Sequence, residues 1–437
     1  MEKRPLQAKV RKIVRRTYSV CPVCLKRIPA RHVQSGGAVY MEKECPEHGR
    51  FSTVLWRGRQ DMAAWRGDTP PIREGENENC PAGCGLCPEH KQGTCCVLLE
   101  VTSRCNLGCR FCFAGAGGGQ DVPFEKVRED LFALAEPGQT LVQLSGGEPT
   151  VRPDLPRVIA AAREAGCAYV QLNTNGVRMG EDEDYVKSLA EAGLSFVFMQ
   201  FDGLDDGIYE TLRGRPLLDV KLRAIENCAK HNLGVTLVPT LVPGVNTGAI
   251  GEMIRFAVSK SPAVRGVHFQ PVSYFGRIPR LPQDSERFTL GELLDAVEDQ
   301  AGDVVPAGSI SPSRCDHPLC GFHGDYIVLP DGTLKALHKK QSSCCCGAQT
   351  TTAAQNRAFV ARKWQRPKEE PVEAGSDDIE TLEGFVRRVK THSFTLTAMA
   401  FQDAGNLDIE RLRRCSLHVF KDGRFIPFCA HYLSPLA

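Results

Sequence analysis

The sequence predicts an α/β fold whose centre is a parallel sheet, closed or partly closed. Two observations predict it. Short apolar runs recur between residues 96 and 280, and amphipathic segments with apolar residues three or four positions apart lie between them. Strands that alternate with such helices form parallel sheets, which bind ligands at the carboxyl ends of their strands. Glycine-rich and polar motifs follow these runs, so we expect the functional site there.

The strands are expected where apolar and β-branched residues run together. They cover residues 96–102, 140–146, 168–174, 195–201, 234–240 and 266–272. Two of the helices between them are expected within residues 123–137 and 155–166, where the apolar stripe stops at Pro137 and Gly166.

The composition divides the chain into four parts. We expect a small metal-binding knuckle at 1–60, a cysteine-rich connector at 61–95, the α/β unit at 96–280 and a C-terminal region at 281–437. In the last part a helix is expected at 289–300 and a hairpin at 416–428, turning at Asp422 and Gly423. The polar stretch 343–377 is expected to be loop.

Charge and hydropathy limit the classes of partner that we expect for this protein. The 437 residues include 54 Lys plus Arg and 52 Asp plus Glu, so no overall positive field favours nucleic acid. No run of 18 apolar residues occurs, and the basic arm at 1–20 lacks an apolar signal core. We expect a cytoplasmic protein whose arm is solvated, with a peripheral membrane contact left open.

Twenty cysteines are too many for packing alone. Without a secretory signal, a reducing compartment disfavours disulfides, so metal or iron–sulfur ligation is the default. Cys167 and Cys228 stand apart from the others in apolar helical segments, and we expect them to be packing residues.

Three thiols, Cys105, Cys109 and Cys112, directly follow the first strand. Asn106 and Gly108 permit the tight curl that brings them together. Three thiolates can hold three irons of a 4Fe-4S cluster and leave the fourth iron open for a ligand. A zinc site that borrows a fourth ligand from elsewhere is the alternative.

This Cys-x3-Cys-x2-Cys spacing, with an aromatic residue before the last cysteine, resembles the signature of the radical S-adenosylmethionine superfamily. The resemblance implies that the open iron binds the amino and carboxylate groups of S-adenosylmethionine. It also implies cleavage of that cofactor to a 5'-deoxyadenosyl radical, which abstracts hydrogen from an unactivated C–H bond.

The segment "SGGEP" at 145–149 looks like the GGE motif of that superfamily. The resemblance implies that Gly146 and Gly147 let the backbone approach the cofactor and that Glu148 accepts a hydrogen bond from its ammonium group.

Polar residues also end the later strands. Asn173 and Thr174 are expected to meet the ribose or the carboxylate of the cofactor, although an ordinary turn would explain them almost as well. Gln200 and Gln270 are candidates for cofactor or substrate contact, and His268 is expected to belong to the core.

Further cysteine groups predict one or two auxiliary 4Fe-4S clusters and a mononuclear zinc or iron site. One loop holds Cys80, Cys84, Cys87 and Cys95, and a second group is Cys315, Cys320, Cys415 and Cys429, provided that the fold brings them together. The knuckle offers Cys21, Cys24, Cys45 and His48. Cys344, Cys345 and Cys346 diverge as neighbours must, so we expect an adventitious role for them.

The segments "CPVC…CPEHG", "GLCPEHKQGTC", "FQPVSYFGR" and "IPFCAHY" are together similar to the archaeal tetraether lipid synthases and their microbial relatives. This likeness implies a partial (β/α)6 TIM-like barrel with several iron–sulfur centres. It implies carbon–carbon bond formation on isoprenoid or alkyl lipid chains, while related enzymes modify other substrates, including small cofactors by C-methylation.

The function we expect is therefore that of a radical enzyme acting on a lipid or another small molecule and reduced by a ferredoxin or flavodoxin. Radical C-methylation of a small cofactor and peptide maturation are alternatives. A non-catalytic iron–sulfur electron carrier is the rival from another class, but it would have no need of the strand-end motifs.

Overall fold

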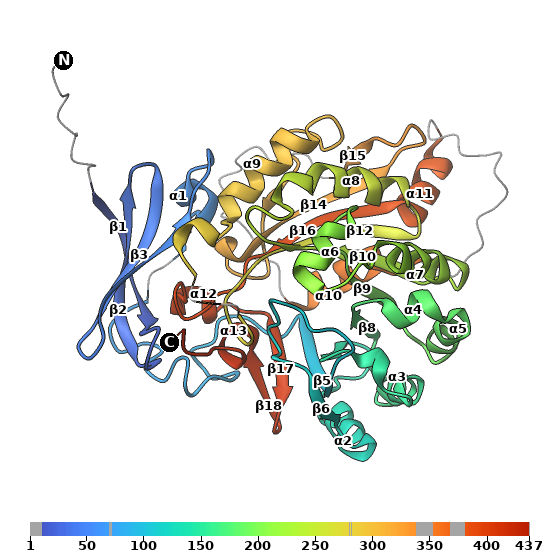
Figure 1. The fold of residues 1–437 in the computed structure, drawn as a ribbon, viewed down its shortest axis with the longest axis horizontal. Coiled ribbons are helices and arrows are strands. Elements are labelled where there is room, and N and C mark those ends of the chain that lie inside the picture. Colours follow the sequence, from blue (N-terminus) through green and yellow to red (C-terminus); the bar gives the residue numbers. More distant parts are fainter. Residues whose placement is uncertain are drawn as a thin grey trace.

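The computed structural model describes residues 11–69, 72–278, 280, 282–337, 353–367 and 381–436. Two sheets organise this part of the chain (Figure 1). The N-terminal sheet has four antiparallel strands, β1 (Lys12–Val20), β2 (Arg27–Ser35), β3 (Ala38–Cys45) and β4 (Gly49–Trp56).

The main sheet contains the six predicted strands, and each pairs in parallel with the next. They are β5 (Cys96–Arg104), β7 (Leu141–Gly146), β8 (Tyr169–Thr174), β9 (Phe196–Gln200), β10 (Gly234–Val238) and β12 (Val264–Pro271). The α/β fold with a parallel sheet is thus confirmed.

The C-terminal residues extend both edges of this sheet. On one edge β16 (Ser393–Met399) pairs in parallel with β12, and β14 (Gly321–Val328) pairs antiparallel with β16. On the other edge β17 (Leu417–Lys421) pairs in parallel with β5 and begins the predicted hairpin. The shorter strands are β6 (Gly118–Asp121), β11 (Thr240–Leu241), β13 (Ser311–Pro312), β15 (Leu334–Ala336) and β18 (Arg424–Pro427).

Helices follow the strands as the amphipathic segments predict. They are α1 (Met62–Arg66), α2 (Phe124–Leu134), α3 (Leu155–Glu164), α4 (Val177–Glu181), α5 (Glu183–Glu191), α6 (Asp206–Arg213), α7 (Leu218–Lys230), α8 (Ile250–Ser259), α9 (Leu290–Ala301), α10 (Ala353–Trp364), α11 (Leu382–Thr391), α12 (Ile409–Leu412) and α13 (Phe428–His431). Short 3-10 turns lie at Pro149–Val151, Thr247–Ala249, Asp284–Glu286 and Pro318–Cys320. Within the described ranges, every helix is too short or too polar to cross a membrane.

One helix corrects the sequence prediction: α10 lies inside the stretch 343–377, for which the sequence predicts a loop. Its local pattern is only weakly amphipathic, and the helix is held instead by Trp364, which packs against Phe196 and Phe198 at centroid distances of 5.6 and 4.5 Å. Such tertiary contacts leave no periodic signal in the sequence. Cys344, Cys345 and Cys346 lie outside the described residues.

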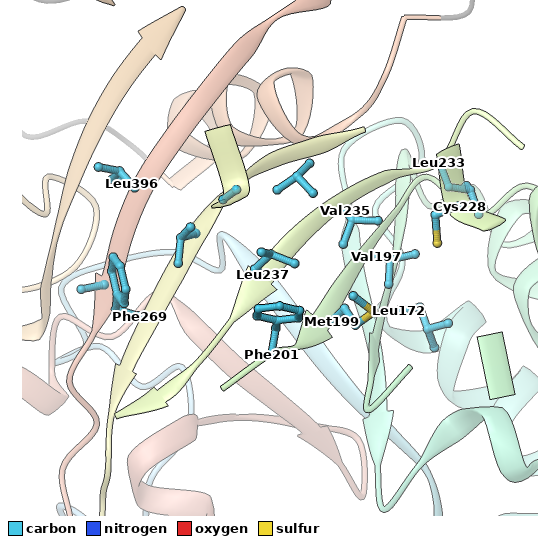
Figure 2. Close-up of a cluster of buried hydrophobic side chains, with 14 of the residues drawn as sticks. Leu172, Val197, Met199, Phe201, Cys228, Leu233, Val235, Leu237, Phe269 and Leu396 are labelled. Atoms are coloured by element: carbon cyan, nitrogen blue, oxygen red, sulfur yellow. The ribbon is translucent and has the colours of Figure 1, made fainter. Parts of the chain in front are cut away.

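The two faces of the main sheet differ in chemistry. Alternate residues such as Val142, Leu172, Val197 and Leu237 pack against the surrounding helices in the large apolar core that Figure 2 shows in part. The inner face is the one opposite these helices, and polar side chains are common on it because residues in a strand alternate between faces. Examples are Gln143, Gln171, Asn173, Thr236 and His268.

Helix α10 also packs against the amino ends of the strands on this side of the sheet. A Cβ placed on Gly234 would lie 2.2 Å from the carbonyl oxygen of Trp364. Arg265, fully buried at the start of β12, donates to the carbonyls of Lys363 at 2.8 Å and Lys390 at 3.3 Å, and also to that of Thr391. This guanidinium therefore holds the carboxyl ends of α10 and α11 together.

Replacing Arg265 by methionine is expected to lower the free energy of unfolding by about 3 kcal/mol, because three helix-end carbonyls lose a charged donor. Urea unfolding followed by circular dichroism measures the loss. The control is Arg255→Met, which removes an ion pair whose arginine side chain is 46% exposed and should cost less than about 1 kcal/mol. Equal midpoints for the two variants would contradict the bridging role of Arg265.

Candidate active site

The cluster loop, residues 105–112, begins at the carboxyl end of β5 and carries three partly exposed thiols, Cys105, Cys109 and Cys112. Backbone hydrogen bonds fix both of its ends. Cys105 N donates to Gly117 O at 3.0 Å, and Cys112 exchanges hydrogen bonds of 3.1 and 2.9 Å with Arg277. Arg277 Nε also donates to the carbonyl of Cys109 at 3.0 Å. The protein itself therefore holds the loop in its curl.

Electrostatics indicates that the three thiols share one small region. Burial raises the pKa of Cys105 to about 11, and the charges of Glu148, Cys109 and Cys112 act in the same direction against the hydrogen bond from Leu107 N. Thiolates in such a region repel one another unless a cationic group binds them. Three thiols with an accessible side fit a 4Fe-4S cluster that has one open iron.

Gly146 and Gly147 lie directly against the backbone of β5, and their predicted role of letting the backbone approach the cofactor stays a prediction. A Cβ on Gly146 would lie 2.2 Å from Thr102 O, and one on Gly147 would lie 2.0 Å from Arg104 O. Gly147 N and Glu148 N donate to these same two carbonyls at 2.8 Å. The close neighbour is thus the end of β5, and the glycines let β7 support the strand that carries the cluster loop.

Gly147→Ala is expected to displace the end of β5 and to lower iron incorporation by roughly tenfold or more, the usual cost of losing support around a metal site. Iron and sulfide content after anaerobic reconstitution measures the effect. Gly118→Ala is the matched control, because a Cβ at Gly118 meets nothing within 4 Å. Full iron content in Gly147→Ala would contradict this assignment.

Glu148 joins the ends of β7 and β8. Its Oε1 accepts hydrogen bonds from Thr150 N at 3.1 Å and from the hydroxyls of Thr150 and Thr174 at 2.6 Å. Its Oε2 accepts one from Asn175 N at 2.6 Å. In the described part of the chain Oε2 has no other partner, so it is the oxygen with room for a further donor. The hydrogen bond to the cofactor ammonium stays a prediction.

The other strand-end candidates lie on one edge of the sheet. Asn173 Oδ1 accepts from Gln171 Nε2 at 2.6 Å, and Gln270 is half-buried at the end of β12. Gln200 accepts a hydrogen bond from Lys221 at 2.7 Å and donates one to Asp202, so both ends of its amide are engaged by the protein. Its contact with cofactor or substrate stays a prediction.

His268 is half-buried, as these groups are. Its Nδ1 lies 2.8 Å from the Thr397 hydroxyl, and burial lowers its pKa to about 4.

Sequence reasoning missed a buried ionic group beside the cluster loop. Asp202 pairs with Arg213 through contacts of 2.7 and 2.8 Å, and Arg213 also bonds to the thiol of Cys109. Lys221 donates to the carbonyls of Asn175 and Gln200, and burial lowers its pKa to about 7 against the opposing charge of Asp202. No motif spacing links residues from a strand end and two helices.

One signal for Lys221 was nevertheless present. It occupies the same helical stripe as the buried Ala224, Ile225 and Cys228, where an apolar residue is the usual choice. A lysine on a buried stripe predicts a polar site behind the helix.

The knuckle brings four candidate metal ligands together. The ligand atoms of Cys21, Cys24, Cys45 and His48 lie within 4.8 Å of one another. His48 Nδ1 is 3.6 Å from the sulfur of Cys21 and 3.5 Å from that of Cys45. Zn–S bonds of about 2.3 Å and Zn–N bonds of about 2.0 Å at tetrahedral angles separate S from N by roughly 3.5 Å, so the donors fit zinc.

Among the remaining cysteines, Cys95 and Cys315 are grouped differently from the prediction. Cys95, expected with Cys80, Cys84 and Cys87, instead hydrogen-bonds to Cys315 and lies 3.8 Å from the sulfur of Cys96. The reason is that residues 95 and 96 lead into β5, away from the connector loop.

Cys415 lies between two groups of thiols. Its charge acts on Cys84, which hydrogen-bonds to Cys80, and the charges of Cys320 and Cys429 act on Cys415 itself. Burial raises the pKa of Cys415 well above its ordinary value, and the charges of Asp316, Cys429 and Cys320 act in the same direction. The thiols thus form two neighbouring sets. One is Cys80, Cys84, Cys320, Cys415 and Cys429, and the other is Cys95, Cys96 and Cys315.

Comparisons with known proteins agree with this site. Residues 99–257 match the model of the radical SAM superfamily, and residues 13–57 match the HMPTM N-terminal zinc ribbon domain. The protein is a radical SAM enzyme, and its superfamily implies a 4Fe-4S cluster and S-adenosylmethionine as cofactors.

The 7,8-dihydro-6-hydroxymethylpterin dimethyltransferase of Methanocaldococcus jannaschii is 34% identical to the chain over 472 aligned residues, which cover 95% of this chain and 93% of that protein. The chain belongs to the family of this dimethyltransferase.

Other matches are more local. The Fe-coproporphyrin III synthase of Methanosarcina barkeri is 36% identical over 148 residues, which are 32% of this chain and 35% of that protein. The solved structure of Streptococcus suis SuiB aligns at a TM-score of 0.40 and 16% identity, over 48% of this chain and 47% of that one. The likeness to tetraether lipid synthases stays a resemblance.

Proposed function

We propose that this enzyme methylates carbon atoms of a small pterin, 7,8-dihydro-6-hydroxymethylpterin or a close relative. The observation that carries the proposal is the similarity to the dimethyltransferase along nearly the whole of both chains, zinc ribbon included. Carbon–carbon bond formation on lipids, which the sequence motifs predict, is not supported by a similarity of this extent.

The inner face of the sheet also favours a polar substrate. Gln171 Oε1 and Thr236 Oγ1 are buried there and have no hydrogen-bond partner among the described residues. Buried polar atoms normally find partners, and leaving one unpaired costs about 1–3 kcal/mol. A nitrogen heterocycle offers donors and acceptors to such groups, whereas an alkyl chain offers none.

Three groups of residues have different roles in the proposed reaction. Cys105, Cys109 and Cys112 hold the cluster, which together with S-adenosylmethionine supplies the hydrogen-abstracting radical chemistry. Glu148 fixes the two strand ends beside it, and the pair of Asp202 and Arg213 neutralises charge next to the loop.

The proposal includes a zinc ion at the knuckle. It also includes one or two auxiliary clusters, which the two neighbouring sets of thiols around Cys84 and Cys95 would hold. In the proposal, a ferredoxin or flavodoxin is the electron donor that reduces the enzyme.

The test is an anaerobic assay of the reconstituted enzyme with dithionite, S-adenosylmethionine carrying a labelled methyl group and the dihydropterin. A small-molecule extract of the cells that produce the enzyme is added to supply any other one-carbon donor. A parallel assay replaces the dihydropterin with isoprenoid lipids. Mass spectrometry should detect a pterin heavier by one or two methylene units. Cofactor cleavage with an unchanged pterin, or a coupled lipid product, would overturn the proposal.

A further inference from the structure

The six parallel strands β5, β7, β8, β9, β10 and β12 contain a single acidic residue, Glu100 on β5. Its neighbours Leu99 and Val101 face the helices, so alternation places Glu100 on the opposite, inner face. The side chain is 31% exposed, which leaves acceptor positions of the carboxylate open. An ionised group at this point of the sheet requires an explanation.

Two side chains hold this carboxylate in place. The Tyr432 hydroxyl donates to Glu100 Oε1 at 2.7 Å, and His431 Nε2 lies 3.6 Å from Oε2. Burial opposes ionisation, but these two contacts outweigh it, so the pKa of Glu100 lies below its usual range. Since a carboxylate has about four acceptor positions, each oxygen keeps room for one more donor.

The same contacts place Glu100 close to the cluster loop. Phe113, which directly follows Cys112, meets the ring of Tyr432 edge-on at a centroid distance of 4.9 Å. The charge of Cys112 also acts on Tyr432. In Figure 1, α13 lies beside the β5–β17 edge of the main sheet. A molecule bound to Glu100 would therefore lie near the thiols that hold the catalytic cluster.

The other acidic groups near the cluster loop are less available. Glu148 accepts four hydrogen bonds from Thr150, Thr174 and Asn175, and it is 2% exposed. Asp202 is fully buried against Arg213. Glu100 combines a charge, a fixed orientation and free acceptor positions.

We propose that Glu100 binds the substrate, accepting a pair of parallel N–H hydrogen bonds from a 2-aminopyrimidin-4-one edge. This inference rests on the proposed function, because a pterin presents its ring N–H and its exocyclic amine side by side. Two parallel charge-assisted hydrogen bonds give both affinity and orientation. Tyr432 is a positioning residue in this arrangement, since it acts on the substrate through Glu100.

The experiment measures binding to the reconstituted enzyme loaded with S-adenosylmethionine, using two probes. One is 7,8-dihydro-6-hydroxymethylpterin and the other is the same compound without its 2-amino group. The wild type should bind the pterin roughly 10- to 100-fold more tightly than the deamino compound. Glu100→Gln should weaken pterin binding by a similar factor and bring the two affinities together.

The controls separate recognition from folding. Glu125→Gln changes an acidic residue that is 75% exposed on α2 and should keep the wild-type preference. Tyr432→Phe leaves Glu100 in place but frees its orientation, so the preference should shrink without vanishing. Iron content is measured for every variant, and the ratio of the two affinities is compared only at matched loading.

The outcomes are distinct. A preference for the pterin that persists in Glu100→Gln, or an equal loss for both probes, overturns the role of Glu100 while the proposed function stands. A wild type that binds neither probe overturns the proposed function and this inference with it. Loss of the preference in Glu100→Gln alone supports the inference.

Discussion

Cys109→Ala is expected to abolish the formation of 5'-deoxyadenosine from S-adenosylmethionine in the reduced, reconstituted enzyme. A variant with two thiols in the cluster loop leaves two irons of a 4Fe-4S cluster without a protein ligand. The loss should therefore exceed the roughly 10- to 100-fold cost of removing a group that only supports a metal ligand. Chromatography of the quenched reaction, together with the iron content, measures both consequences.

The structure makes Cys109 the most informative of the three positions. Arg213 bonds to its thiol while pairing with Asp202, so the substitution also leaves a charged group without one of its contacts. Cys228→Ala is the matched control, because this thiol is fully buried in the apolar core and belongs to none of the candidate ligand sets. It should keep its cluster and its activity. Cofactor cleavage by Cys109→Ala at wild-type rates would contradict the assignment of the cluster loop.

The parts of the fold and site that could be predicted share one property, which is that their signal is local. The six strands are continuous apolar runs, and the three thiols stand within eight residues of one another. The ligands of the knuckle are almost as local, since Cys45 and His48 are three positions apart and β3 brings them back to Cys21.

The parts that could not be predicted depend on convergence in space. Lys221, Asp202 and Arg213 come from α7, the end of β9 and α6, and only the sheet places them beside the cluster loop. The partners of Cys95 and Cys415 are set by which strand each residue leads into. Glu100 lies within a predicted strand, and only the fold brings it to its partner Tyr432, 332 residues away.

Removing the metal from the knuckle is expected to unfold β1–β4 while the main sheet stays folded. The apolar cluster around the metal site is small, with Cys21, Ile28 and Cys45 at its centre. Zinc binding supplies about 10–16 kcal/mol in small zinc domains, which is more than such a core contributes. The main sheet has its own large core and should not need the metal.

Unfolding of this sheet would also expose a buried ionic network at its contact with α12. Asp408 accepts a hydrogen bond from the Thr17 hydroxyl at 2.6 Å and pairs with His32 at 3.0 Å. Burial opposes the charge of Asp408, but the contacts with His32 and Thr17 outweigh it and keep its pKa below the ordinary range. Glu410 pairs with Arg15 of the same sheet.

Loss of the sheet would therefore remove the His32 and Thr17 contacts of Asp408. It would also remove the Arg15 contact of Glu410, which keeps its contacts with His317 and Thr69. Because α12 leads directly to Cys415, we expect the auxiliary thiols to lose iron as well, although none of them belongs to the knuckle.

Cys45→Ser and chelation of the wild type are the two ways to test this. Hydrogen exchange should show protection lost across residues 12–56 and α12, and retained in β7 to β10. Cys167→Ser removes a buried thiol from the apolar core and should leave both the zinc content and the exchange of β1–β4 unchanged. If metal-free protein keeps full protection in β1–β4, packing rather than zinc stabilises the knuckle. Retention of auxiliary iron despite an unfolded knuckle would show that α12 keeps its position without the contacts of Asp408 and Glu410.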